Sequence, residues 1–151
     1  MLTALMGLLE AEDRAYAAIE LESLALVHPW PDDDAAFDHL RLVSESFRRR
    51  GYPLLLVTAT VEDAAYLDRT LRALAADDIR FVRLEAPVEV LRGRLTRREP
   101  PDWVGLPGLL ERLEGLAASI ASLPGVDLVV KTDAADARAV ARSLRDVLQH
   151  P

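Results

Sequence analysis

Pro53-Leu-Leu-Leu-Val-Thr-Ala59 is the stretch of sequence that decides the fold class. A continuous apolar run of this length is typical of a strand that is buried on both faces, as in the interior of a parallel sheet. Apolar residues at helical spacing follow between Leu67 and Leu74, and Thr60 is the expected N-cap, with Asp63 three residues later. A buried strand that leads directly into an amphipathic helix indicates an α/β fold.

The same alternation of strand and helix continues on both sides of this stretch. No repeat, low-complexity tract or linker interrupts it. We therefore expect one α/β domain over residues 1–151, with three layers and a mainly parallel sheet flanked by helices. The other expected helices cover residues 2–9, 37–47, 88–95, 109–120 and 140–147. The other expected strands cover residues 15–21, 79–85 and 126–130. We expect residues 27–34 to form a loop and Asp133 to cap the last helix.

Composition and charge exclude several classes of protein. Half of the residues are hydrophobic, and 18 basic against 25 acidic residues give a net charge of −7. This balance argues against disorder and against non-specific binding to nucleic acid or to an anionic membrane. The chain has no cysteine, which excludes disulfides and thiolate metal sites. The apolar N-terminus has no basic region and is followed by Glu10, so neither an export signal nor a membrane span fits, and we expect a cytoplasmic protein.

Two segments in the second half carry a family resemblance. They are Phe81-Val-Arg-Leu-Glu-Ala-Pro-Val-Glu-Val-Leu-Arg-Gly-Arg-Leu-Thr-Arg-Arg-Glu99 and Val129-Val-Lys-Thr-Asp133. In their order and spacing they resemble P-loop kinases of the nucleoside-monophosphate, shikimate and chloramphenicol phosphotransferase type. The resemblance implies that the arginines of the first segment lie in a lid that holds ATP and that the second segment lies near the adenine. The implied nucleotide-binding residues are Arg94, Arg97, Arg98, Thr132 and Asp133.

Without the resemblance, the arginine cluster has a simpler explanation. Arginines at the end of a helix are favoured by the helix dipole, and runs of charge are usually solvated. Arg94 and Arg98 are the better candidate pair for phosphate, because their i, i+4 spacing places them on one face of the helix.

The defining phosphate loop of that family is absent from these residues. No G-x-x-x-x-G-K-[ST] occurs, and the only lysine is Lys131. The resemblance implies that the lost strand belongs at the centre of the sheet, between Leu54–Thr58 and Ile79–Leu84. Both neighbouring strands would then have an unpaired edge, so we expect the chain to close the gap, to borrow a strand from a partner such as a second copy, or to fold poorly. A start placed too far downstream, a truncation, and loss of the loop in a degenerate kinase are the competing explanations.

Glu20 and Glu22 are the candidate catalytic residues. They alternate along the end of the strand expected over residues 15–21, where open α/β sheets bind ligands. One of them could accept a proton from a substrate hydroxyl or hold Mg²⁺ through water. The alternative is an exposed strand end, because carboxylates are mostly surface residues. Which of the two glutamates matters stays open.

The loop after this strand is the candidate acceptor site. In His28-Pro-Trp-Pro-Asp-Asp-Asp34, Trp30 offers a stacking face, and His28 and Asp32 offer polar groups. The alternative is a plain connection with a helix cap. No histidines or carboxylates have the spacing of a transition-metal site, so no protein-held metal is expected.

The functional expectation combines these parts. The complete protein would be an ATP-binding P-loop NTPase or small-molecule kinase that uses ATP and Mg²⁺. We do not expect ATP or Mg²⁺ to bind tightly to this chain, and we therefore expect the chain to be inactive. The alternative from a different class is a non-catalytic binding or interaction module derived from the same fold. A small molecule is the expected partner, but the sequence does not identify the acceptor.

Overall fold

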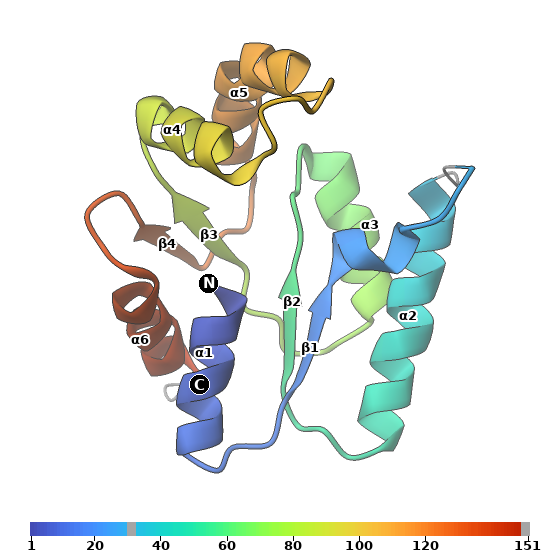
Figure 1. Cartoon of the computed structure of the whole chain (residues 1–151). Coiled ribbons are helices and arrows are strands. Elements are labelled where there is room, and N and C mark those ends of the chain that lie inside the picture. Colours follow the sequence, from blue (N-terminus) through green and yellow to red (C-terminus); the bar gives the residue numbers. More distant parts are fainter. Residues whose placement is uncertain (30–32, 149–151) are drawn as a thin grey trace. The chain divides into compact units, whose positions relative to one another are not determined.

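The computed structural model describes residues 1–29 and 33–148. The chain divides into two compact units, residues 1–79 together with 137–151 and residues 80–136. In chain order the elements are α1 (Leu2–Ala11), β1 (Ala17–Glu20), the 3₁₀ helix η1 (Leu21–Ala25), α2 (Asp33–Arg49), β2 (Leu55–Thr58), α3 (Ala64–Leu74), β3 (Val82–Glu85), α4 (Val88–Arg98), α5 (Leu106–Ala121), β4 (Leu128–Lys131) and α6 (Ala137–Val147) (Figure 1).

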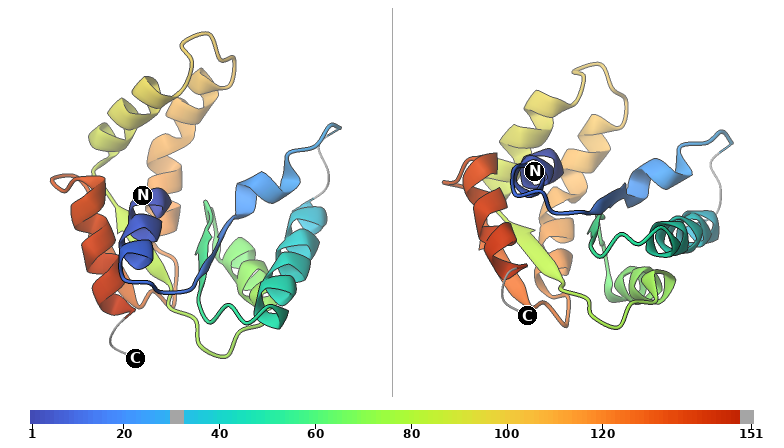
Figure 2. Two further views of the ribbon diagram at one scale, coloured as in Figure 1. Left: turned by 60° about the horizontal axis from the view of Figure 1, so that its bottom comes forward. Right: turned by 90° about the horizontal axis from the view of Figure 1, so that it is seen from below.

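The first unit has helices on both faces of a two-stranded sheet. β1 and β2 pair in parallel, with Ile19 opposite Val57 and Leu56 opposite Ala18. Because successive side chains in a strand point to opposite faces, these two pairs lie on opposite sides of the sheet. The Ile19 side packs against Phe37 and Leu40 of α2 and against the end of α3. The other side packs against α1 and α6 (Figure 2), through a cluster of Leu5, Leu9, Leu56 and Ala141.

Helix ends in the first unit are fixed by local chemistry. Gly51 follows α2 with φ of +84°, a conformation that glycine adopts without the steric cost of a side chain. Asp63 is the N-cap of α3, where its side chain accepts a hydrogen bond from the backbone N–H of Tyr66 at 2.7 Å. The expected cap, Thr60, lies outside the helix, so the prediction of that helix start was wrong by three residues.

The second unit pairs β3 with β4 in parallel and packs α4 against α5. Val82 lies opposite Leu128, and Glu85 lies opposite Lys131. Arg83 is 14% exposed and binds the Glu85 carboxylate at 2.7 Å. It also donates to the carbonyl oxygen of Ala121 at 2.9 Å, at the end of α5. One largely buried guanidinium group therefore connects α5 to β3.

Each sheet contains two strands, and no ladder of hydrogen bonds joins β2 to β3 in the described part of the chain. The N–H of Ala17 donates to the carbonyl oxygen of Leu54 at 2.8 Å. Because the bonds of a parallel ladder alternate along a strand, the N–H groups of Leu55 and Val57 point away from β1. Within the described residues β2 therefore has one unpaired edge, as the family resemblance implied, and β3 likewise pairs only with β4.

The expectation of an α/β fold with parallel strands is confirmed. Several boundaries differ from it: β1 covers Ala17–Glu20 and not residues 15–21, and α2 begins at Asp33, inside the expected loop. The strand expected over residues 79–85 begins at Val82, after Phe81 and Asp127 have exchanged hydrogen bonds at 2.7 and 2.9 Å. The last helix begins at Ala137, so Asp133 does not stand before it, whereas Asp136 does.

Candidate functional site

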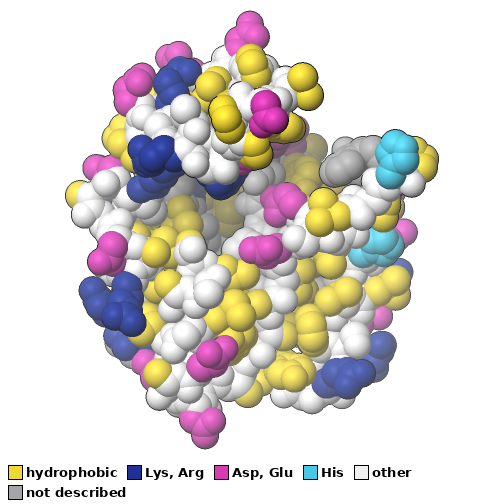
Figure 3. Space-filling model, in the orientation of Figure 1, with side chains coloured by type: hydrophobic (Ala, Val, Ile, Leu, Met, Phe, Trp, Pro, Cys, Tyr) yellow, Lys and Arg dark blue, Asp and Glu magenta, His cyan; other side chains and the backbone are white. Residues whose placement is uncertain are grey.

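The first unit has an open cavity of about 370 Å³ at the carboxyl end of β1. β1 contributes Ala18, Ile19 and Glu20 to its wall. The surface over β1 and η1 carries mainly hydrophobic side chains, with carboxylates among them (Figure 3). The remaining walls of the cavity are Leu2, Thr3 and Met6 of α1, Ser23 and Leu24 of η1, and Val43 and Phe47 of α2.

Glu20 and Glu22 occupy different environments. Glu20 ends β1 and lines the cavity, where the Ser23 hydroxyl lies 3.5 Å from its carboxylate. Glu22 lies in η1, so it does not continue the alternation of the strand. Its carboxylate accepts a hydrogen bond from the backbone N–H of Thr60 and thereby ties η1 to the segment that follows β2. Of the two glutamates, Glu20 is the one that lines the cavity.

The candidate acceptor loop is described in part. His28 is exposed, and Trp30 and Asp32 lie outside the described residues. Farther along, Nδ1 of His39 donates a hydrogen bond to the carbonyl oxygen of Leu24 at 2.7 Å. This bond holds α2 against η1 beside the cavity.

Two candidate nucleotide-binding residues contact each other in the second unit. Nη1 of Arg94 donates to the Thr132 hydroxyl at 2.8 Å, and Nη2 of Arg94 donates to the Thr132 carbonyl oxygen. The Thr132 hydroxyl donates in turn to the carbonyl oxygen of Glu85 at 3.0 Å. These bonds join α4 to the carboxyl ends of β3 and β4, so Arg94 is a positioning element of this unit.

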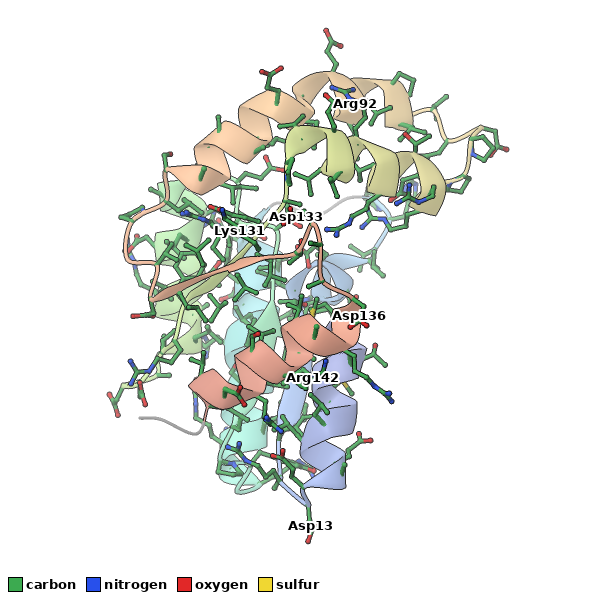
Figure 4. All side chains as sticks on the ribbon, turned by 90° about the vertical axis from the view of Figure 1, so that its left-hand side faces the viewer. Asp13, Arg92, Lys131, Asp133, Asp136 and Arg142 are labelled. Atoms are coloured by element: carbon green, nitrogen blue, oxygen red, sulfur yellow. The ribbon has the colours of Figure 1, made fainter. Side chains whose placement is uncertain are left out.

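The remaining candidates lie at the exposed end of α4 and after β4. Nε of Arg98 donates to the carboxylate of the neighbouring Glu99 at 2.6 Å. Arg97 is exposed and has no hydrogen bond or ion pair within the described ranges; its Nη1 lies over Gly93, 3.3 Å from where a β-carbon would stand. Asp133 is exposed, close to Lys131 at the carboxyl end of β4 (Figure 4).

Metal-ligating side chains do not gather into larger groups in residues 1–29 and 33–148. Within those ranges, no group of three or more His, Asp or Glu side chains could hold an ion. None of the helices in the described ranges is long and apolar enough to cross a bilayer.

Sequence reasoning missed most of the cavity wall. Met6 and Phe47 lie far apart in the sequence and meet only because α1 and α2 lie on opposite faces of the sheet. Phe47 was identified as part of the buried face of its helix, but a helical stripe does not separate core residues from residues that line a cavity.

Comparison with known proteins gives one structural likeness. No protein-family model matches the chain, and no curated protein matches it in sequence. A crystal structure of a gluconokinase from Sinorhizobium meliloti 1021 superposes with a TM-score of 0.51 and 20% sequence identity, over 97% of this chain and 87% of that chain. The chain has a P-loop kinase-like fold. At this level of identity the likeness concerns the fold alone, because one fold supports many functions.

Each of the two units has a short sheet of two parallel strands. The resemblance implied a strand next to β2 and next to β3, and within the described residues each of these two strands has one hydrogen-bonded partner strand, as β1 and β4 also have. The α/β fold with a shortened sheet is therefore what both the sequence and the structural likeness support.

Proposed function

We propose that this chain is the scaffold of an ATP-dependent small-molecule phosphotransferase. The observation that carries the proposal is the fold likeness to a gluconokinase over 97% of the chain. It is supported by a carboxylate beside a cavity in the first unit and by arginines at the end of α4 in the second. Phosphoryl transfer depends on positioning and on electrostatic stabilisation, and these are the residue types it uses.

Each candidate residue has a distinct role in this proposal. Glu20 accepts the proton of the acceptor hydroxyl or organises Mg²⁺ through water. Arg97 and Arg98 bind phosphate oxygens, and Arg98 must leave Glu99 to do so. Arg94 acts indirectly, since its bonds to Thr132 hold α4 at the strand ends.

Residues 1–151 are not expected to turn over ATP by themselves. They contain no glycine-rich loop with a lysine and Ser or Thr, so the backbone N–H groups that cradle the β- and γ-phosphates are missing from them. Arginine side chains alone supply positive charge, but they do not replace the fixed arrangement of backbone N–H groups around the phosphates.

A non-catalytic binding module is the second candidate function. It is favoured by the finding that Arg94, Thr132 and Glu22 all have structural partners in the protein. In this case the cavity beside Glu20 binds a small molecule, and the arginine cluster only stabilises the second unit.

An extension experiment separates the two candidates. The melting temperature is measured with Mg²⁺ and ATP for the 151-residue chain and for the same chain preceded by an apolar strand and a G-x-x-x-x-G-K-T loop. The phosphotransferase scaffold predicts no shift for the first protein and a rise for the second; saturation at 100 times Kd corresponds to about 2.7 kcal/mol. No shift in either folded protein favours the binding module, and a rise in the unextended chain would overturn the proposed need for the loop.

A further inference from the structure

A second open cavity of the first unit lies between α1 and α6, and we call it the α1–α6 groove. Its volume of about 510 Å³ falls in the range of about 300–1,000 Å³ that is usual for small-molecule sites. Arg138 and Arg142 form the α6 wall, and the α1 wall contains the small residues Ala4, Gly7 and Ala11. Arg142 lies on α6 where this helix packs beside α1 (Figure 4). The groove is therefore large enough for a small organic ligand.

The two arginines of the groove are available to a ligand. Arg138 and Arg142 are exposed, and neither has an ion pair or a side-chain hydrogen bond with another residue of the described ranges. By contrast, Arg145 on the same helix binds Glu12 of α1 at 3.1 Å. Because Arg138 and Arg142 are four residues apart, their β-carbons lie on one face of the helix at a distance of about 5–6 Å. Two guanidinium groups so placed can bind oxygens of the same phosphate.

The charges around the groove favour an anion. Among the described residues, no carboxylate lines it. The carboxylates of the two helices have other partners, because Glu10 accepts a hydrogen bond from the Tyr16 hydroxyl, and Glu12 and Asp146 both bind Arg145. The amino terminus of the chain stands before the first turn of α1 and is also positively charged. An anion in the groove therefore meets positive charge that no neighbouring acid of these helices neutralises.

The α1 wall leaves room for the body of a ligand. Glycine is unfavourable in the middle of a helix, and nothing lies within 4 Å of the position that a β-carbon on Gly7 would occupy. Ala4 and Ala11 add only methyl groups to the same wall. After Ala11 the chain turns and enters β1 at Ala17, so this end of the groove lies toward the amino end of β1. Open α/β sheets usually bind their ligands at the opposite, carboxyl edge, and the groove is therefore a different place from the cavity beside Glu20.

We propose that the α1–α6 groove is a second ligand site and that it binds an organic phosphate, namely a phosphomonoester with a small apolar body. The phosphate accepts hydrogen bonds from the guanidinium groups of Arg138 and Arg142, and the apolar body lies against Ala4, Gly7 and Ala11. This site uses neither Glu20 nor the arginines of α4, so it goes beyond the proposed function and does not depend on it.

Three probes test the ligand class. They are phenyl phosphate, phenol and inorganic phosphate, titrated into the 151-residue chain by NMR at neutral pH without ATP or Mg²⁺. We expect phenyl phosphate to shift the amide resonances of Gly7 and Arg142 and to bind about tenfold or more tightly than the other two probes, because it alone combines the phosphate with an apolar ring. Equal binding of phenol, equal binding of inorganic phosphate, or no shift at Gly7 and Arg142 would overturn the proposal.

Paired arginine variants test the charged wall. Replacing Arg138 and Arg142 together by glutamine should weaken the binding of phenyl phosphate about tenfold or more. Replacing Arg50 and Arg112 together by glutamine is the control, since it removes the same charge from exposed arginines outside the groove and should leave binding unchanged. Equal weakening in both double variants would mean that only the net charge matters, and it would contradict the site.

A glycine variant tests the apolar wall. Gly7→Leu places a side chain in the groove and should remove the binding of phenyl phosphate without unfolding the protein. Gly115→Leu on α5 is the matched control, because nothing lies within 4 Å of its β-carbon position either and it does not line the groove. A folded Gly7→Leu variant that binds phenyl phosphate as the unmodified chain does would overturn the proposal. If this variant does not fold, the arginine variants decide the question.

Discussion

The guanidinium group of Arg94 donates to the Thr132 hydroxyl at 2.8 Å, and this hydroxyl donates onward to the carbonyl oxygen of Glu85 at 3.0 Å. A threonine hydroxyl has one proton, so it accepts from Arg94 and donates to Glu85 without conflict. The chain of bonds connects a helix with two strand ends, and all three residues are partly or fully buried. It gives the Thr132 side of the Thr-Asp turn in the family resemblance a structural role in this protein.

Replacing this hydroxyl should destabilise the protein. Thr132→Val keeps the shape of the side chain but leaves Arg94 without its hydroxyl partner, and it should lower the free energy of unfolding by about 1–3 kcal/mol. Thr132→Ser keeps the hydroxyl and should lose much less. Denaturant unfolding of the two variants measures the difference, and equal stability would show that the bond contributes nothing.

Replacing Glu22 should lower the stability of the protein more than replacing Glu20. Glu22→Ala removes the acceptor of the Thr60 N–H and should lower the melting temperature, because a partner is lost from the connection between η1 and the segment after β2. Glu20→Ala removes an exposed carboxylate that accepts a long hydrogen bond of 3.5 Å from the Ser23 hydroxyl, so the melting temperature of this variant should change little. The reverse order, measured by thermal unfolding, would contradict the assignment of Glu22 to structure and of Glu20 to the cavity.

Gly105 should not tolerate a methyl group. The ring of Trp103 lies so close to Gly105 that a β-carbon there would clash with it. Gly105→Ala should therefore displace the Trp103 ring and change its fluorescence, with little loss of stability, because Trp103 is 42% exposed and its ring can move into solvent. Gly108→Ala is the matched control in the same segment, since nothing lies within 4 Å of its β-carbon position. Identical spectra for Gly105→Ala and the unmodified chain would refute the packing of Trp103.

The pKa of Tyr16 should depend on Glu10. The Tyr16 hydroxyl donates to the Glu10 carboxylate at 2.5 Å, and this hydrogen bond is the main cause that raises the pKa of the phenol above its ordinary value. The folded state therefore holds this proton more tightly than the unfolded chain, so the contribution to stability is present below about pH 10 and is lost as the pH rises through the folded pKa. Spectroscopic titration should show a lower pKa of Tyr16 in the Glu10→Ala variant. The Tyr16→Phe variant lacks this phenol, so comparison with it identifies the part of the signal that comes from Tyr16. An unchanged titration curve in Glu10→Ala would exclude the bond as the cause.

Elements with a strong local pattern could be predicted from the sequence. The apolar run from Pro53 to Ala59 contains β2, and Leu5 and Leu9 of the expected N-terminal stripe are buried in the core of the first unit. Burial of a continuous apolar segment is a local property, so the sequence carries the information. The unpaired edge of β2 could also be anticipated, because the resemblance identified which strand was missing.

Details that depend on competition between nearby residues could not be predicted. Thr60 and Asp63 are both acceptable N-caps, and the carboxylate of Asp63 captures the Tyr66 N–H while the Thr60 N–H binds Glu22. The 3₁₀ turn that removes Glu22 from the strand likewise has no distinct pattern in Leu21–Ala25. The cavity depends on residues that are distant in sequence and meet only in the folded first unit.

The unpaired edge of β2 can be measured directly by amide hydrogen exchange, under conditions where sedimentation shows the chain to be monomeric. The N–H groups of Leu56 and Thr58 point toward β1, whereas those of Leu55 and Val57 point to the open edge. We predict that Leu55 and Val57 exchange about tenfold or more faster than Leu56 and Thr58. Equal protection of all four amides would mean that β2 is paired on both edges, and it would contradict the account of an open P-loop kinase-like sheet.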